Sequence, residues 1–182
     1  MNTRGHDPLL LAGKIVTIIL QAAVGIGAAA MAVATPAALF FQGDIVKGIA
    51  EGTEIPVHDL PFASLAGVLG IGFLMLAAMF VFFGKLRAII DTVGAGEPFE
   101  PANADRLGLM AWLLLGVQAL MWPLAGLAMA LAEWAQRYDE VDLDIGADSF
   151  SLTGILMVLV LFILARVFRH GAAMREDLEG TV

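Results

Sequence analysis

The sequence predicts an all-α membrane protein with four transmembrane helices arranged as two helical hairpins. The first observation is composition: 59% of the 182 residues are hydrophobic and 15% are charged, whereas soluble domains average roughly 45–50% and about 25%. The second is that the apolar residues gather into four long stretches with almost no charge. This balance excludes disordered and coiled-coil chains. The absence of cysteine excludes disulfides and thiolate chemistry.

The four apolar stretches cover residues 15–36, 63–83, 107–131 and 150–167. A helix needs about 20 apolar residues to cross roughly 30 Å of hydrocarbon. The fourth stretch is the shortest, but Arg166 near its end can extend its side chain to the membrane surface. A soluble helical core would need amphipathic partner helices, which the rest of the chain lacks. We therefore expect residues 1–182 to form a single four-helix transmembrane domain.

The basic residues predict that both termini lie in the cytoplasm. Eight of them fall in three segments: two in the N-terminal segment, three in a connector at 84–106, and three in the end of the fourth span and the tail at 168–182. The other two loops carry only Lys47 and Arg137. Because basic residues concentrate on the cytoplasmic side, the connector and tail are predicted to be cytoplasmic. The two external loops hold ten acidic residues, so the net charge of −8 faces outward.

The connector is predicted to begin as a continuation of the second span. Apolar residues recur at helical spacing from Leu86 to Val93. Gly94 and Gly96 should end this helix, and Pro101 suits the first turn of the next one. The connector therefore joins the two hairpins through a short turn.

The second external loop contains the one candidate metal site, in the stretch DLDIGAD. Asp142, Asp144 and Asp148 could offer carboxylates to a cation such as calcium. The spacing departs from an EF-hand loop, which needs acids where Gly146 and Thr153 stand. Alternation of acidic and apolar residues also fits a small β-ribbon with one wet face, and this is the favoured interpretation. No metal is expected as a resident cofactor.

The rest of the chain carries no recognisable catalytic signature. It has no phosphate-binding loop, zinc-hydrolase motif or nucleophile elbow. No charged residue lies at mid-membrane depth, where ion-coupled transporters usually place one. The acidic balance excludes direct nucleic-acid binding by the bulk of the chain. We expect a non-enzymatic protein in the lipid bilayer without a cofactor, and the sequence leaves homo-oligomerisation open.

Two predicted cytoplasmic stretches carry a family resemblance. The connector contains GEPFEPANADRLG from Gly96 onward, and the tail contains ARVFRHGAAMREDLEGTV from Ala165 onward. With four spans, they resemble the bacterial family called domain of unknown function 2975, whose patterns are G-x-PF-x3-N-x2-R-[LI] and VFR-x-G-x2-L-x-ED-x-x-TV. The matching positions are Gly96, Pro98, Phe99, Asn103, Arg106, Leu107, Val167, Phe168, Arg169, Gly171, Glu176, Asp177, Thr181 and Val182. Met174 departs from the pattern, because leucine is usual there.

The resemblance implies a bacterial inner-membrane protein with both termini inside. Members of this family are often encoded beside a small helix-turn-helix regulator, which implies a sensor or antagonist of such a DNA-binding partner. The alternatives are a small transporter or channel subunit, and an assembly factor for a membrane complex. The motif residues are then either a partner-binding surface or a structural clamp, in which Arg106 and Arg169 of connector and tail would pair with Glu176 and Asp177.

Overall fold

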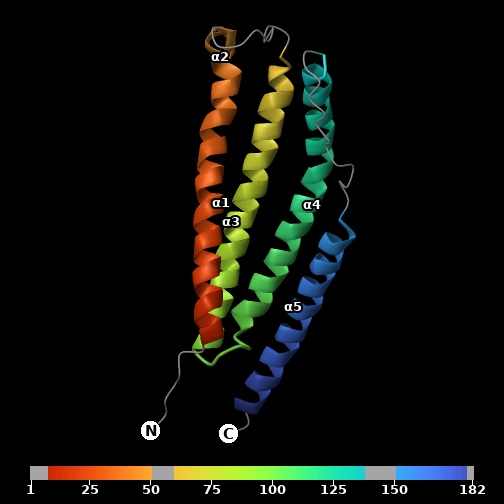
Figure 1. The fold of residues 1–182 in the computed structure, drawn as a ribbon. Coiled ribbons are helices and arrows are strands. Elements are labelled where there is room, and N and C mark those ends of the chain that lie inside the picture. Colours follow the sequence, from red (N-terminus) through yellow and green to blue (C-terminus); the bar gives the residue numbers. More distant parts are fainter. Residues whose placement is uncertain (1–7, 51–59, 138–150, 180–182) are drawn as a thin grey trace. The chain divides into compact units, whose positions relative to one another are not determined.

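The computed structural model describes residues 8–50, 60–137 and 151–179, all of which are helix or short connections (Figure 1). Its five helices are α1 (Pro8–Phe40), α2 (Gln42–Ala50), α3 (Phe62–Gly94), α4 (Pro101–Ala135) and α5 (Leu152–Glu179). The all-α class is therefore confirmed for the described part of the chain. The β-ribbon and the candidate metal ligands Asp142, Asp144 and Asp148 lie outside the described residues.

Four of these helices are long and apolar enough to cross a membrane: α1, α3, α4 and most of α5. Each of these helices is longer than the apolar stretch that was predicted within it. The helix α5 begins at Leu152, two residues after the start of the fourth predicted stretch. The extra length of α3 runs into the connector as far as Gly94, as the apolar spacing predicted. The extra length of α5 makes the tail helical as far as Glu179. The four predicted spans are thus found as four continuous helices.

The short helix α2 was not predicted from the sequence. It follows α1 almost without interruption, since the amides of Asp44 and Ile45 both donate to the carbonyl of Phe41. Gly43 and Gly48 lie within it, and each glycine costs about 1 kcal/mol relative to alanine inside a helix. Because glycine has a low helix propensity, the sequence of this segment did not indicate a helix.

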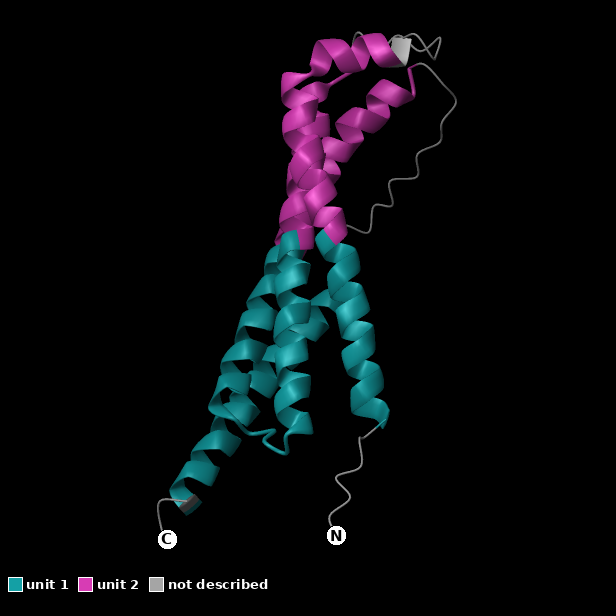
Figure 2. Cartoon of the chain, turned by 90° about the vertical axis from the view of Figure 1, so that its left-hand side faces the viewer, with its two compact units in different colours: residues 1–25, 77–117, 152–182 teal, residues 26–76, 118–151 magenta. Residues whose placement is uncertain are grey.

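The described chain divides into two compact units (Figure 2). Unit 1 comprises Met1–Gly25, Ala77–Val117 and Leu152–Val182, and unit 2 comprises Ile26–Leu76 and Gln118–Ser151. Unit 1 therefore contains the connector, the tail helix and the start of α1. Its buried core is a cluster of apolar side chains from α4 and α5. These are Leu107, Met110, Ala111, Leu161 and Ala165.

Helices in unit 2 approach one another closely at glycines. A Cβ atom placed on Gly67 would lie 2.6 Å from Cδ1 of Leu127, and one on Gly72 would lie 2.7 Å from Sδ of Met31. Small residues allow such close helix packing in membrane proteins, where van der Waals contact provides much of the association energy. These glycines therefore fill a packing role.

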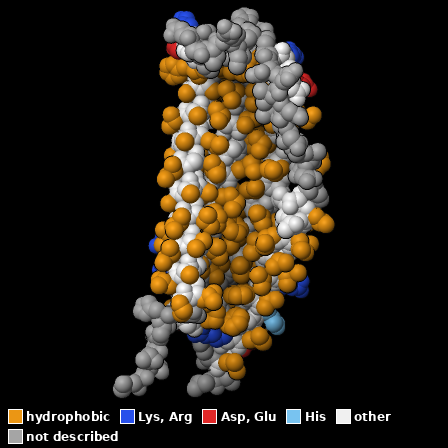
Figure 3. All heavy atoms as spheres, in the orientation of Figure 1, with side chains coloured by type: hydrophobic (Ala, Val, Ile, Leu, Met, Phe, Trp, Pro, Cys, Tyr) orange, Lys and Arg blue, Asp and Glu red, His pale blue; other side chains and the backbone are white. Residues whose placement is uncertain are grey.

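The outer surface of the helices is apolar. Hydrophobic side chains cover most of the visible face in Figure 3. Large side chains such as Ile26 and Trp122 are 73% and 66% exposed. Soluble monomers rarely expose contiguous apolar patches of this kind. Together with the four long apolar helices, this surface supports a multi-pass membrane protein surrounded by lipid.

Candidate functional site

The end of α3 turns sharply into the connector at Gly96. The amide of Glu97 donates to the carbonyl of Thr92, and the amide of Gly96 donates to the carbonyl of Val93, both at 3.0 Å. This pair of bonds is the Schellman motif that closes many helices. The motif needs a left-handed residue, and Gly96 has a φ of +86°. A glycine fits this position because a Cβ atom would be strained there.

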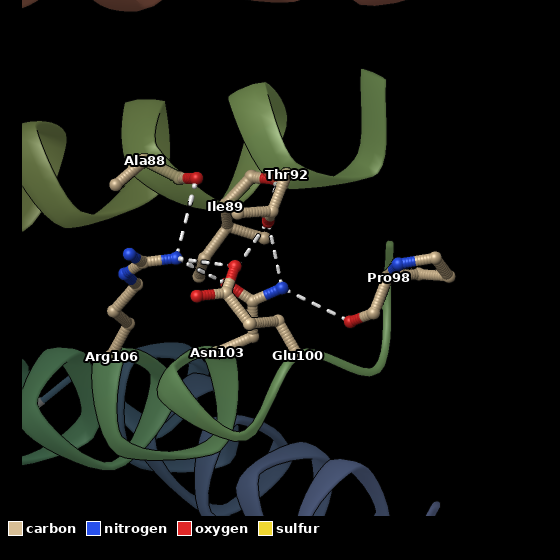
Figure 4. A network of polar contacts seen from close by, with 7 residues as sticks. All are labelled: Ala88, Ile89, Thr92, Pro98, Glu100, Asn103 and Arg106. Atoms are coloured by element: carbon tan, nitrogen blue, oxygen red, sulfur yellow. Dashed lines mark hydrogen bonds and ion pairs between the residues drawn. The ribbon is translucent and has the colours of Figure 1, made fainter. Parts of the chain in front are cut away.

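Asn103 joins the start of α4 to the end of α3 (Figure 4). Its side chain is fully buried, and its amide nitrogen donates to Oγ1 of Thr92 at 2.8 Å and to the carbonyl of Pro98 at 3.0 Å. Its carbonyl oxygen accepts a bond from Nη1 of Arg106 at 2.7 Å. Both polar atoms of the buried amide are therefore satisfied. The asparagine fixes the connector turn between two helices.

Arg106 faces the connector and α3. Besides Asn103, its Nη1 atom lies 3.9 Å from Oε2 of Glu100 and 3.5 Å from the carbonyl oxygen of Ala88. The expected pairing of Arg106 with Glu176 or Asp177 is therefore wrong. The physical reason is that Nη1 of Arg106 already contacts the Asn103 side chain on α4, the Glu100 carboxylate just before α4 and the carbonyl of Ala88 on α3.

The tail helix packs on the connector through aromatic side chains. The rings of Phe99 and Phe168 lie 5.6 Å apart between centroids, with an interplanar angle of 46°. The ring of Phe99 also lies against Gly171, where an added Cβ atom would be 2.7 Å from Cδ1 of Phe99. Phe168 in turn packs against the buried core of unit 1. We call this assembly, residues 92–106 with residues 165–179, the connector–tail clamp.

Two ion pairs run across the clamp, and both have the opposite polarity to the expected pairing of Arg106 with the acidic residues of the tail. Arg169 lies 3.3 Å from Oδ1 of Asp105, and Arg175 lies 4.0 Å from Oε1 of Glu97. The basic partners thus come from the tail and the acidic partners from the connector. The Arg169–Asp105 side chains are 68% and 80% exposed. Such exposed pairs contribute about 0–1 kcal/mol, so the aromatic packing provides more of the attachment.

A third ion pair attaches the start of α1 to the same end of unit 1. Nζ of Lys14 lies 2.6 Å from Oδ1 of Asp91, one residue before Thr92. Sequence reasoning missed Asp91 and Thr92, which precede the connector motif, and it missed Glu97 and Asp105, which occupy variable positions within that motif. The only available signal was the helical continuation of α3, which places residues 91 and 92 next to the connector turn.

The clamp carries an open apolar groove of ≈590 Å³ on its surface. Its lining residues are Phe99, Arg166, Val167, His170, Gly171 and Met174. Met174 is 53% exposed, and Leu178, one helical turn further along α5, is 72% exposed. The groove could hold an apolar side chain of a partner beside the basic groups of Arg166 and His170. The described part of the chain contains no cluster of three or more potential metal ligands.

Comparison with known proteins gives a family and no closer relative. No curated protein and no solved structure matches the chain. A family model described as "Protein of unknown function (DUF2975)" matches residues 49–182. The matched region includes both recognised motifs and three of the four long helices, which confirms the resemblance predicted from the sequence. The chain therefore belongs to the DUF2975 family.

Proposed function

We propose that this chain is a non-enzymatic bacterial inner-membrane protein whose connector–tail clamp binds a cytoplasmic helix-turn-helix regulator. The chain would act as a sensor or antagonist, because a regulator held at the membrane is kept from its DNA. The observation that carries this proposal is the exposed apolar groove beside Phe99 and Met174. The groove is formed by the two motifs that mark the family.

The distribution of charge supports a cytoplasmic position for the clamp. Seven basic residues described by the structure lie in unit 1, while Lys47 and Arg137 lie in unit 2. Unit 1 also contains the connector and the tail helix. By the positive-inside rule, the end of the protein formed by the connector and tail would face the cytoplasm. Both termini would then be cytoplasmic, and the acidic loops would face the opposite side, where they could receive a signal.

The length of α5 supports a surface that reaches into water. The twelve residues from 168 to 179 follow the predicted fourth span and continue the same helix, which adds about 18 Å at 1.5 Å per residue. Met174 and Leu178 project from this extension with most of their side chains exposed. Apolar side chains exposed to water next to a groove are typical of a protein-interaction surface. An amphipathic helix with an acidic edge would complement the groove, since Arg166 and His170 lie along its side.

The test is affinity purification from native membranes in mild detergent, followed by mass spectrometry. We expect the wild-type chain to retain a helix-turn-helix protein in stoichiometric amount. Met174→Glu should reduce its recovery at least tenfold, because a carboxylate would be buried in an apolar groove. Ala173→Glu is the matched control, since Ala173 is exposed on α5 and does not line the groove. It should leave recovery unchanged.

Two outcomes would contradict the proposal. One is equal recovery of the regulator with both variants, which would place its binding site elsewhere on the chain. The other is purification without any DNA-binding protein. A large membrane complex in its place would favour the role of assembly factor.

A further inference from the structure

A second groove, of ≈600 Å³, lies between α4 and α5 within unit 1. One end is apolar and includes the side chains of Leu109, Trp112 and Phe162. The other end is charged and includes Asp105, Arg166 and Arg169. The indole of Trp112 and the ring of Phe162 meet edge to face, 5.4 Å apart, and form one wall. The groove is therefore amphipathic along its length.

The charged end carries one net positive charge. Arg169 is paired with Asp105, with 3.3 Å between Nη2 and Oδ1. Arg166 is exposed and makes no ion pair or hydrogen bond with any residue in the described ranges 8–50, 60–137 and 151–179. Its guanidinium has five N–H donors in a planar arrangement that suits phosphate oxygens. The groove thus offers a cation available to an anionic ligand.

The groove lies at the depth where the membrane surface is expected. Arg106 and Arg166 are the charged residues that bound the charge-free stretches of α4 and α5. Asp105 and Trp112 are seven positions apart on α4, as are Phe162 and Arg169 on α5. Seven residues of helix span about 10 Å. This length covers the distance from a lipid phosphate to the upper part of an acyl chain, and tryptophan is enriched at this level of a bilayer.

We propose that this groove binds an anionic phospholipid of the cytoplasmic leaflet, with its phosphate on Arg166 and an acyl chain along Trp112 and Phe162. The net positive charge discriminates against zwitterionic lipids, because their ammonium or choline group already compensates the phosphate. Basic pockets between transmembrane helices on the cytoplasmic side recognise anionic headgroups in this way. Arg166 lines both grooves, but the lipid site does not require a regulator bound at the first groove.

The test uses native mass spectrometry of the full chain from micelles containing equal amounts of phosphatidylglycerol and phosphatidylcholine with identical acyl chains. We expect phosphatidylglycerol to be retained about tenfold over phosphatidylcholine, because the net positive charge at the groove favours a lipid whose phosphate is not compensated by a choline group. Arg166→Gln should bring the ratio close to one, and Arg166→Lys should keep part of the preference. Arg87→Gln, which removes an exposed charge on α3 outside the groove, should leave the ratio unchanged.

A second measurement locates the lipid in the wild-type protein, so it does not depend on how well the Arg166 variants fold. In nanodiscs of phosphatidylcholine with a minor fraction of brominated phosphatidylglycerol, Trp112 fluorescence should be quenched more strongly than with the same fraction of brominated phosphatidylcholine. Trp112→Phe supplies the background from the other two tryptophans. Equal quenching by both lipids would overturn the proposal. So would a wild-type lipid ratio of one, an unchanged ratio in Arg166→Gln, or displacement of the lipid by inorganic phosphate alone.

Discussion

Replacing Asn103 with alanine should be among the most destabilising single changes in the connector–tail clamp. The side chain is fully buried and makes two neutral hydrogen bonds, to Thr92 and Pro98, and one charge-assisted bond, from Arg106. Neutral bonds contribute about 1 kcal/mol each, and a bond to a charged group contributes about 2. Their loss predicts a decrease of about 4 kcal/mol in the free energy of unfolding.

The effect can be measured by unfolding the purified protein with SDS in mixed micelles. Asn103→Asp provides an informative comparison, because it keeps an acceptor for Arg106 but places a carboxylate oxygen against the carbonyl of Pro98. We expect it to be destabilised as well, whereas Thr92→Ser should remain close to the wild type because its hydroxyl is kept. A loss below about 1 kcal/mol in Asn103→Ala would refute the reasoning, since a buried network with three bonds cannot be removed at so small a cost.

Three further changes test other parts of the clamp by the same unfolding measurement. Gly96→Ala should cost about 1–2 kcal/mol because its φ is positive, whereas Gly94→Ala, with open space around it and no positive φ, should be neutral or slightly stabilising. Gly171→Ala should displace the ring of Phe99 and cost about 1–3 kcal/mol, and rapid proteolysis of the tail would report its release. Arg169→Glu should change stability by no more than about 1 kcal/mol, because its pair with Asp105 is largely exposed; a larger loss would mean that the pair is more shielded than the structure indicates.

The spans and the connector could be predicted from the sequence because their signals are local. Charge-free stretches of about 20 residues mark the membrane segments. Apolar spacing from Leu86 to Val93 predicted the extension of α3, and Gly94, Gly96 and Pro101 marked where α3 ends and α4 begins. The structure agrees at each of these positions. The clamp brings together the motif residues Asn103 and Phe99 of the connector and Gly171 of the tail. No local sequence pattern specifies that these two distant segments meet.

The charge pairing could not be predicted because it depends on how two distant helices are rotated about their axes. Connector and tail each carry both signs of charge, so composition permits either polarity of pairing. The structure pairs Arg169 with Asp105, and Arg106 with groups on α3 and α4. The rotation is set by Phe168 and Gly171, which pack on Phe99 and leave Arg169 beside Asp105. The pairing of charged residues therefore follows from how the side chains of the two helices pack, which the charges in the sequence do not specify.

Photocrosslinking in living cells tests most directly whether the connector–tail clamp is a docking surface for a cytoplasmic regulator. A photoreactive residue would replace Met174 at the groove and, in a separate strain, Leu156 in the middle of the fourth span, where the side chain is 60% exposed. We predict a crosslink from position 174 to a helix-turn-helix protein and none from position 156. The absence of any soluble protein crosslinked at position 174, or the same adducts from both positions, would contradict the account.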